Sequence, residues 1–144
     1  MNYANTKKTQ LLINPVAMTN SATQTANLDT RGADFATIVL SFKAEVNTNA
    51  VGPTLSLLES DDTVVTNFAT VVANRTNEDL ASAKLVRYDV DTRGRKRYLR
   101  LSVTTATATN DDVTVTAMGI LDRREDEANS TSDLVASGSV VVTV

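Results

Sequence analysis

The residues with the greatest potential for chemistry form one basic group. Five cations and one aromatic ring lie within eight positions of one another: Arg93, Arg95, Lys96, Arg97, Tyr98 and Arg100. Guanidinium and ammonium groups at this density could bind a phosphate or an acidic surface of a protein partner. The same pattern is typical of a solvated turn whose arginine stems cover apolar neighbours. Acids at Asp89, Asp91 and 122–127 could neutralise the group, within one chain or between chains.

Two pairs of adjacent acids are candidates for a calcium site: Asp61 with Asp62, and Asp111 with Asp112. Calcium is held by carboxylates that cluster in loops. The chain has no Asp-x-Asp-x-Asp-Gly spacing, and adjacent acids are common in solvated turns. We therefore expect no metal ligands and no cofactor.

Two tyrosines, Tyr88 and Tyr98, could stack on a sugar ring. Aromatic residues make up only 4% of the chain and tryptophan is absent, so a carbohydrate site has little support. The simpler expectation is that both rings are strand or rim residues of the fold.

The sequence contains no histidine and no cysteine. Histidine is the commonest general base, and serine or threonine cannot form an ordinary nucleophile–base pair without such a partner. The absence of cysteine excludes disulfides and thiolate metal sites. We therefore expect a protein that is not an enzyme.

The element that positions the basic group is a turn that occurs twice. Asp-Thr-Arg-Gly stands at 29–32 and again at 91–94, and each copy precedes a long apolar run. Asp at the first position and Gly at the fourth indicate a tight type I turn, in which the Asp side chain bonds to the nearby backbone. The sequence thus predicts one turn used twice, each time leading into a strand.

Alternating apolar and polar residues predict eight or nine strands. Their expected ranges are 10–13, 22–28, 35–46, 54–59, 64–72, 84–90, 97–109, 113–121 and 134–144. A polar turn of hairpin length at 60–63 joins two of them, and Asn77 could cap a single short helix. In the strand from 97, Leu99 and Leu101 should face inward and Arg100 outward.

Long strands separated by turns predict an all-β fold: a single-domain antiparallel β-sandwich. A jelly roll is the favoured topology, with an immunoglobulin-like sandwich as the alternative. The expected organisation is a flexible N-terminal arm at 1–9, the sandwich at 10–121 and a polar linker at 122–133.

The last segment, 134–144, is a strongly apolar C-terminal strand. Such a strand must be covered, either within its own domain or on a neighbouring subunit. Its apolar residues join the basic group as candidate partner contacts: Leu134, Val140, Val142 and Val144.

The totals limit the remaining choices. The chain has 144 residues, 42% of them hydrophobic, and a formal net charge of −3. An acidic balance argues against a general nucleic-acid binder. No run of about 18 apolar residues occurs, so we expect no membrane span and synthesis in the cytoplasm.

Two stretches of the chain resemble small structural proteins of tailed bacteriophages. They are LSLLESDD at 55–62 and DVDTRGRKRYLRL at 89–101, and LDTRG at 28–32 looks similar to the way such domains open. The resemblance covers residues 28–121, and its most specific part is the second turn with its basic-aromatic tail.

The resemblance implies a capsid cement or decoration protein, bound to the outside of a phage head. Such a protein would form a homotrimer, contact the major capsid protein and stabilise the shell by bridging its subunits. It would have no direct nucleic-acid role and would be located in the virion. The alternative is a tail or fibre-associated β-sandwich domain that binds a host glycan.

Overall fold

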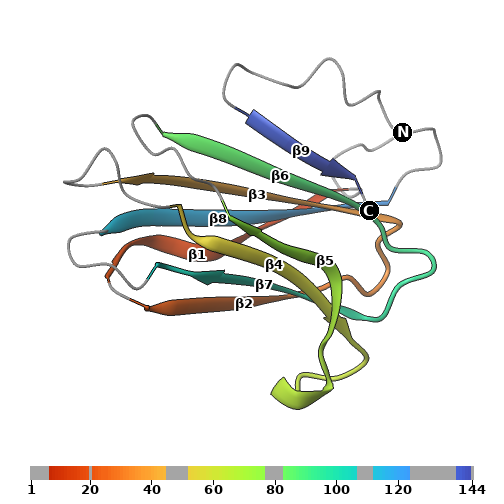
Figure 1. The fold of residues 1–144 in the computed structure, drawn as a ribbon. Helices are drawn as coiled ribbons and strands as arrows, with labels where there is room; N and C mark the ends of the chain where they lie inside the picture. Colours follow the sequence, from red (N-terminus) through yellow and green to blue (C-terminus); the bar gives the residue numbers. More distant parts are fainter. Residues whose placement is uncertain are drawn as a thin grey trace.

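Two facing β-sheets make up the protein (Figure 1). The computed structural model describes residues 7–19, 21–44, 52–76, 83–106, 112–123 and 139–143. The strands are β1 (Lys7–Met18), β2 (Thr23–Asp29), β3 (Phe35–Ala44), β4 (Thr54–Ser60), β5 (Ala69–Thr76), β6 (Lys84–Asp91), β7 (Tyr98–Thr104), β8 (Val113–Asp122) and β9 (Ser139–Thr143). No described segment forms a helix of the length and apolarity that a bilayer span requires.

The order of the strands defines a jelly roll. One sheet runs β1-β8-β3-β6-β9 and the other β2-β7-β4-β5. β1 pairs with β8, β2 with β7, β3 with β6 and β4 with β5, all antiparallel. This nested pairing is one long hairpin rolled up so that its strands alternate between two sheets. An immunoglobulin-like sandwich orders its strands differently, so the favoured topology is confirmed and its alternative is not.

β9 is an addition to the eight-stranded roll. It lies at the edge of the five-stranded sheet, where it pairs with β6 in parallel (Figure 1). Every other ladder among the described strands is antiparallel.

Successive side chains of a strand point to opposite faces of its sheet. Every second residue therefore points into the space between the two sheets, and apolar side chains fill that space. The largest fully buried side chains are Tyr88, Phe42, Met18, Leu28, Ile38, Leu40, Leu55, Leu57, Leu99, Leu101 and Val86. The inward positions predicted for Leu99 and Leu101 are confirmed.

Three expected strands differ in their limits. β7 ends at Thr104, although the expected strand continued to 109, and the described residues Thr105 and Ala106 lie outside any strand. The sequence predicted one strand over 64–72 after a hairpin turn at 60–63, and this prediction is wrong. Residues 61–68 form a longer loop that contains the 3-10 turn η2 (Val65–Asn67), and β5 starts only at Ala69. The reason is Asp62, whose side chain accepts hydrogen bonds from the Val64 N–H and the Asn67 amide and so bends the chain.

The first strand is longer than expected. β1 begins at Lys7, within the range expected as an arm, and continues to Met18 past Pro15. The register shifts between Leu11 and Ile13 and again before Val16, which accommodates the proline at the edge of the sheet. The helix expected from Asn77 lies outside the described residues.

Candidate partner-contact surface

One end of the sandwich gathers most of the residues that the sequence singled out. We define the corner end as residues 29–34, 59–68 and 91–98. The register places these segments together, because Tyr98 lies opposite both Asp29 and Ser60, and Phe35 opposite Asp91. In Figure 1 the two turns lie at the right of the molecule, and the loop between β4 and β5 lies at its lower edge.

Both Asp-Thr-Arg-Gly turns are crossings between the two sheets. The first leads from β2 to β3 and the second from β6 to β7, in the opposite direction. In each, the aspartate Oδ1 accepts a hydrogen bond from the backbone N–H two residues later, at 3.1 Å: Arg31 to Asp29 and Arg93 to Asp91. A tight turn therefore occurs at both places, each at a corner of the jelly roll, but the predicted positions within it are wrong. The Ala33 N–H bonds to the Thr30 carbonyl and the Arg95 N–H to the Thr92 carbonyl, so the turns begin at threonine and Gly is third rather than fourth. Gly32 also has a positive φ, which the expected type I turn does not require.

The two corners interlock through their threonines. Thr30 Oγ1 donates to the Arg97 carbonyl at 2.7 Å, and Thr92 Oγ1 donates to the Ala33 carbonyl at 2.7 Å. The backbone N–H of Thr30 bonds to the same Arg97 carbonyl, and that of Thr92 bonds to the Asp34 carbonyl. Both threonines are buried, so each corner satisfies polar groups of the other away from water.

Two corner arginines have the same arrangement of partners. Arg93 donates two hydrogen bonds to Asp91, at 2.9 and 2.6 Å, and its guanidinium lies 5.1 Å from the centre of the Phe35 ring. Arg97 donates two to Asp29, at 3.0 and 2.7 Å, and lies 4.7 Å from the Tyr98 ring. A bidentate carboxylate and a ring face together fix the plane of each guanidinium.

These contacts lower the pKa of both carboxylates. The pKa of Asp91 falls to about 2, first because the Arg93 side chain donates to it and next because the Arg93 backbone N–H does. The pKa of Asp29 is lowered chiefly by the Arg97 side chain. The pKa values of Arg93 and Arg97 are raised by the same pairs. Both ion pairs are therefore charged at neutral pH.

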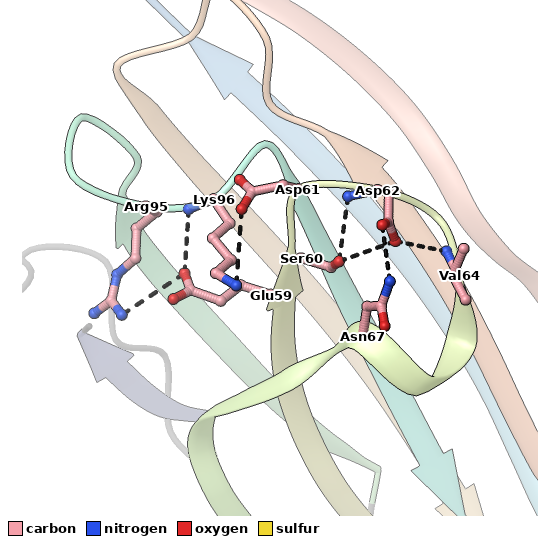
Figure 2. A network of polar contacts seen from close by, with 8 residues as sticks. All are labelled: Glu59, Ser60, Asp61, Asp62, Val64, Asn67, Arg95 and Lys96. Atoms are coloured by element: carbon pink, nitrogen blue, oxygen red, sulfur yellow. Dashed lines mark hydrogen bonds and ion pairs between the residues drawn. The ribbon is translucent and has the colours of Figure 1, made fainter.

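The loop between β4 and β5 is held by a second set of polar contacts (Figure 2). Asp62 accepts hydrogen bonds from Ser60 Oγ, from the Val64 N–H and from Asn67 Nδ2, at 3.3, 2.9 and 2.8 Å. The Ser60 hydroxyl in turn accepts from the Asp62 N–H. The pKa of Asp62 is lowered, with the Asn67 amide as the largest cause.

Two ion pairs join this loop to the second corner (Figure 2). Glu59 Oε2 lies 3.8 Å from an Arg95 nitrogen and accepts a long hydrogen bond from the Lys96 N–H. The Lys96 ammonium lies 3.8 Å from Asp61. The acid pair at 61–62 thus serves a salt bridge and a loop network, and the described residues contain no cluster of three potential metal-binding acids.

Two valines stand exposed on this loop. Val64 is 54% and Val65 71% exposed. Alternation predicted both in a strand, so neither was among the candidate contact residues. The signal that could have found them is the spacing of Ser60, Asp62 and Asn67, which suits a capped loop better than a strand.

Arg100 corrects another expectation. It points to the outer face of its sheet, as the alternation predicts, but only 8% of it is exposed. Its guanidinium lies 3.8 Å from the centre of the Phe68 ring and donates to Asn27 Oδ1 at 2.8 Å. The ring at the end of the 61–68 loop covers the arginine, which makes Arg100 a support for that loop rather than a solvent-facing cation.

The corner end is therefore not a uniformly basic patch. Arg93, Arg95, Lys96 and Arg97 each face a carboxylate of the same chain. Asp91 is one of the neutralising acids that the sequence suggested, whereas Asp89 pairs with Arg87 on β6.

The remaining candidates lie elsewhere. Val140 and Val142 are in β9, opposite Val86 and Tyr88 of β6. Leu134 and Val144 are outside the described residues. Tyr88 is fully buried in the core, so the sugar-stacking pair with Tyr98 is wrong.

Comparisons with known proteins add similarities of fold. No family model matches the chain, and neither does any curated protein sequence. Among solved structures, a chain of infectious bursal disease virus, Gx strain, matches with a TM-score of 0.49 and 14% identity over 85% of this chain; this chain spans about a third, 33%, of that one. The tobacco streak virus coat protein matches with a TM-score of 0.43 and 9% identity, over 92% of this chain and 97% of the other. Neither TM-score reaches 0.5, so these similarities do not decide the function.

Proposed function

We propose that this chain is a structural virion protein: a capsid cement or decoration protein that binds the outside of a phage head and bridges its capsid subunits. Its partner is the major capsid protein, and it acts as a homotrimer without binding nucleic acid directly. The phage-protein resemblance at 55–62 and 89–101 supports this proposal, because both stretches contribute to the corner end. The eight-stranded roll is an architecture used by viral capsid domains, although lectins and cupins share it.

The observation that carries the proposal is the pair of exposed valines on a fixed frame. Single exposed apolar residues are ordinary, but Val64 and Val65 are adjacent and more than half exposed. The loop that presents them is held by the Asp62 network, by the stacking of Phe68 on Arg100 and by the salt bridge between Asp61 and Lys96. A surface that is already ordered loses little conformational entropy on binding, which favours affinity.

The ion pairs of the corner end also favour a protein partner. Exposed ion pairs add little net stability, so the pairs around the corner arginines are better understood as fixing a pattern of charge. Protein–protein interfaces combine an apolar core with a polar rim, and the corner end offers residues of both kinds. A nucleic acid would favour cations without acidic partners.

Binding to shells tests the proposal. The purified chain is mixed with DNA-free shells assembled from the major capsid protein of the same virus, and co-sedimentation gives the affinity. Replacing both valines, V64K/V65K, should weaken shell binding at least tenfold, because two charges would enter the apolar centre of the contact. Thermal unfolding of the variant should stay within about 0.5 kcal/mol of the parent, since both side chains face solvent.

The matched control is L11K. Leu11 is also 54% exposed, but it lies on β1 away from the corner end, so its replacement should leave shell binding unchanged. If the parent chain does not co-sediment with shells at micromolar concentration, the cement role is wrong. If V64K/V65K binds as well as L11K, the role survives and the corner end is not the contact surface.

A further inference from the structure

We infer that the edge of β6 is an acceptor for the C-terminal strand of a second copy of this chain. The inference goes beyond the proposed function, since it concerns how copies join to one another rather than what they bind. In the single chain, β9 occupies this edge through five paired positions, from Leu85 opposite Ser139 to Asp89 opposite Thr143. An assembled protein would keep the same pairing but take the strand from a neighbour.

The first reason is the weak attachment of β9 to its own domain. It pairs with β6 alone, at the outer edge of the sheet, while the eight strands of the roll form a complete nested hairpin without it. The ladder is parallel, a geometry slightly less stable per residue than an antiparallel one. Removing β9 therefore exposes one sheet edge but leaves the roll intact.

The second reason is the reach of the connection. β8 ends at Asp122, which lies level with Phe35 and, across β3, with Asp91. β9 starts opposite Leu85, six positions back along β6. At about 3.3 Å per residue and about 4.8 Å per strand, the chain has to cover about 25 Å to dock on its own β6.

The connection is much longer than this distance requires. Sixteen residues, 123–138, separate β8 from β9, and a chain of that length can span about 55 Å when extended. The connection can span about twice the distance that docking on its own β6 requires. It is therefore long enough for β9 to reach the β6 edge of an adjacent subunit. Its sequence is polar and highly charged over 122–133, without a core pattern that would hold it on its own domain.

Exchange costs no contacts. A swapped β9 makes the same ladder as an unswapped one, so the balance depends on chain concentration and on how neighbours are held. Three copies that pass their strands in one direction would form a closed ring. Such a ring would link subunits through backbone hydrogen bonds.

Disulfide trapping tests the inference, and the chain has no cysteine of its own to interfere. Leu85→Cys and Ser139→Cys variants, each with a different mass tag, are unfolded together, refolded at high concentration and oxidised. Paired strand positions place the two cysteines within bonding distance. We expect a covalent product that contains both tags, because it forms only when the strand of one chain lies on β6 of another.

The control uses a pair that belongs to one domain. Thr23 and Thr104 are opposed on β2 and β7, with their hydroxyls 2.9 Å apart. T23C mixed with T104C should give only a trace of the two-tag product, and the double variant should close within one chain. If L85C/S139C likewise closes only within one chain, and mixing its single variants yields no two-tag product, the inference is overturned.

Shortening the connection separates exchange from simple aggregation. Deleting residues 124–131 leaves a reach of about 30 Å, little more than the distance of about 25 Å to the chain's own β6 edge. The two-tag product should fall at least tenfold, while L85C/S139C in the shortened chain closes internally. Shell binding by V64K/V65K and strand exchange are independent readouts, so either proposal can fail without the other.

Discussion

The two corners of the jelly roll share four residues but differ in how they are held. The turn hydrogen bond is alike in both, since Asp29 and Asp91 each accept from the N–H two residues later, and Thr30 and Thr92 each donate to a carbonyl of the other corner. The ion pairs differ. Arg93 binds the aspartate of its own turn, whereas Asp29 of the first turn is bound by Arg97, which follows the second turn.

The length of each crossing explains the difference. Five residues separate β2 from β3, and six separate β6 from β7. The longer crossing contains Arg95, Lys96 and Arg97, which reach Glu59, Asp61 and Asp29 respectively. Local sequence thus determines the turn, and the surrounding fold determines which charges pair.

The threonine interlock should have the largest effect on stability. T30V and T92V each keep the side-chain shape but remove a buried hydroxyl donor. We expect each to lower the free energy of unfolding by about 1–2 kcal/mol. If the corners act as a unit, the loss of unfolding free energy in the double variant will differ from the sum of the two single losses by more than about 0.5 kcal/mol. Urea unfolding measures all three variants.

Thr25 provides the matched control, since it is an exposed threonine on β2. T25V should change stability by less than about 0.5 kcal/mol. Strict additivity of T30V and T92V would mean that the two corners are independent, in spite of their reciprocal hydrogen bonds.

Replacing the turn glycines by alanine should have different effects on stability in the two corners. Gly32 has a φ of +80°, which side chains other than glycine rarely adopt, whereas Gly94 does not have a positive φ. An added Cβ meets nothing within 4 Å at either site, so only the backbone conformation distinguishes them. G32A should destabilise by about 1 kcal/mol and G94A by less than about 0.5 kcal/mol. Equal effects in thermal unfolding would show that the corners have the same backbone requirements.

Much of this fold follows from patterns within short stretches. Alternation identified the inward face of β7, and the repeated Asp-Thr-Arg-Gly motif identified the places of both turns. These features depend on residues close in the sequence. The loop at 61–68 was missed because Val64 and Val65 have strand propensity, and the Asp62 side-chain contacts override it.

The candidate surface was only partly predictable. The sequence located the basic residues but not their partners, because Asp29 is 68 positions from Arg97 and Glu59 is 36 from Arg95. Pairing over such distances requires the register of the sheets. Arg100 was misjudged for a related reason: the residue that covers it, Phe68, comes from another strand connection.

Acid titration should give the smallest effect and compare the two ion pairs directly. The pKa of Asp91 is about 2 in the fold and near 3.8 otherwise, and the pKa of Asp29 is also lowered. A carboxylate with a depressed folded pKa stabilises the protein above its unfolded pKa, and this contribution is lost as the pH falls through the folded value. Stability should therefore decline between about pH 4 and pH 2.

D91N should reduce this decline by removing a local pair. D29N should reduce the decline too, and it should also free Arg97 from the first corner. The change in unfolding free energy of T92V/D29N should therefore differ from the sum of its two single changes, whereas that of T92V/D91N should equal the sum. Urea unfolding at a series of pH values measures both, and equal coupling would mean that Asp29 does not link the corners.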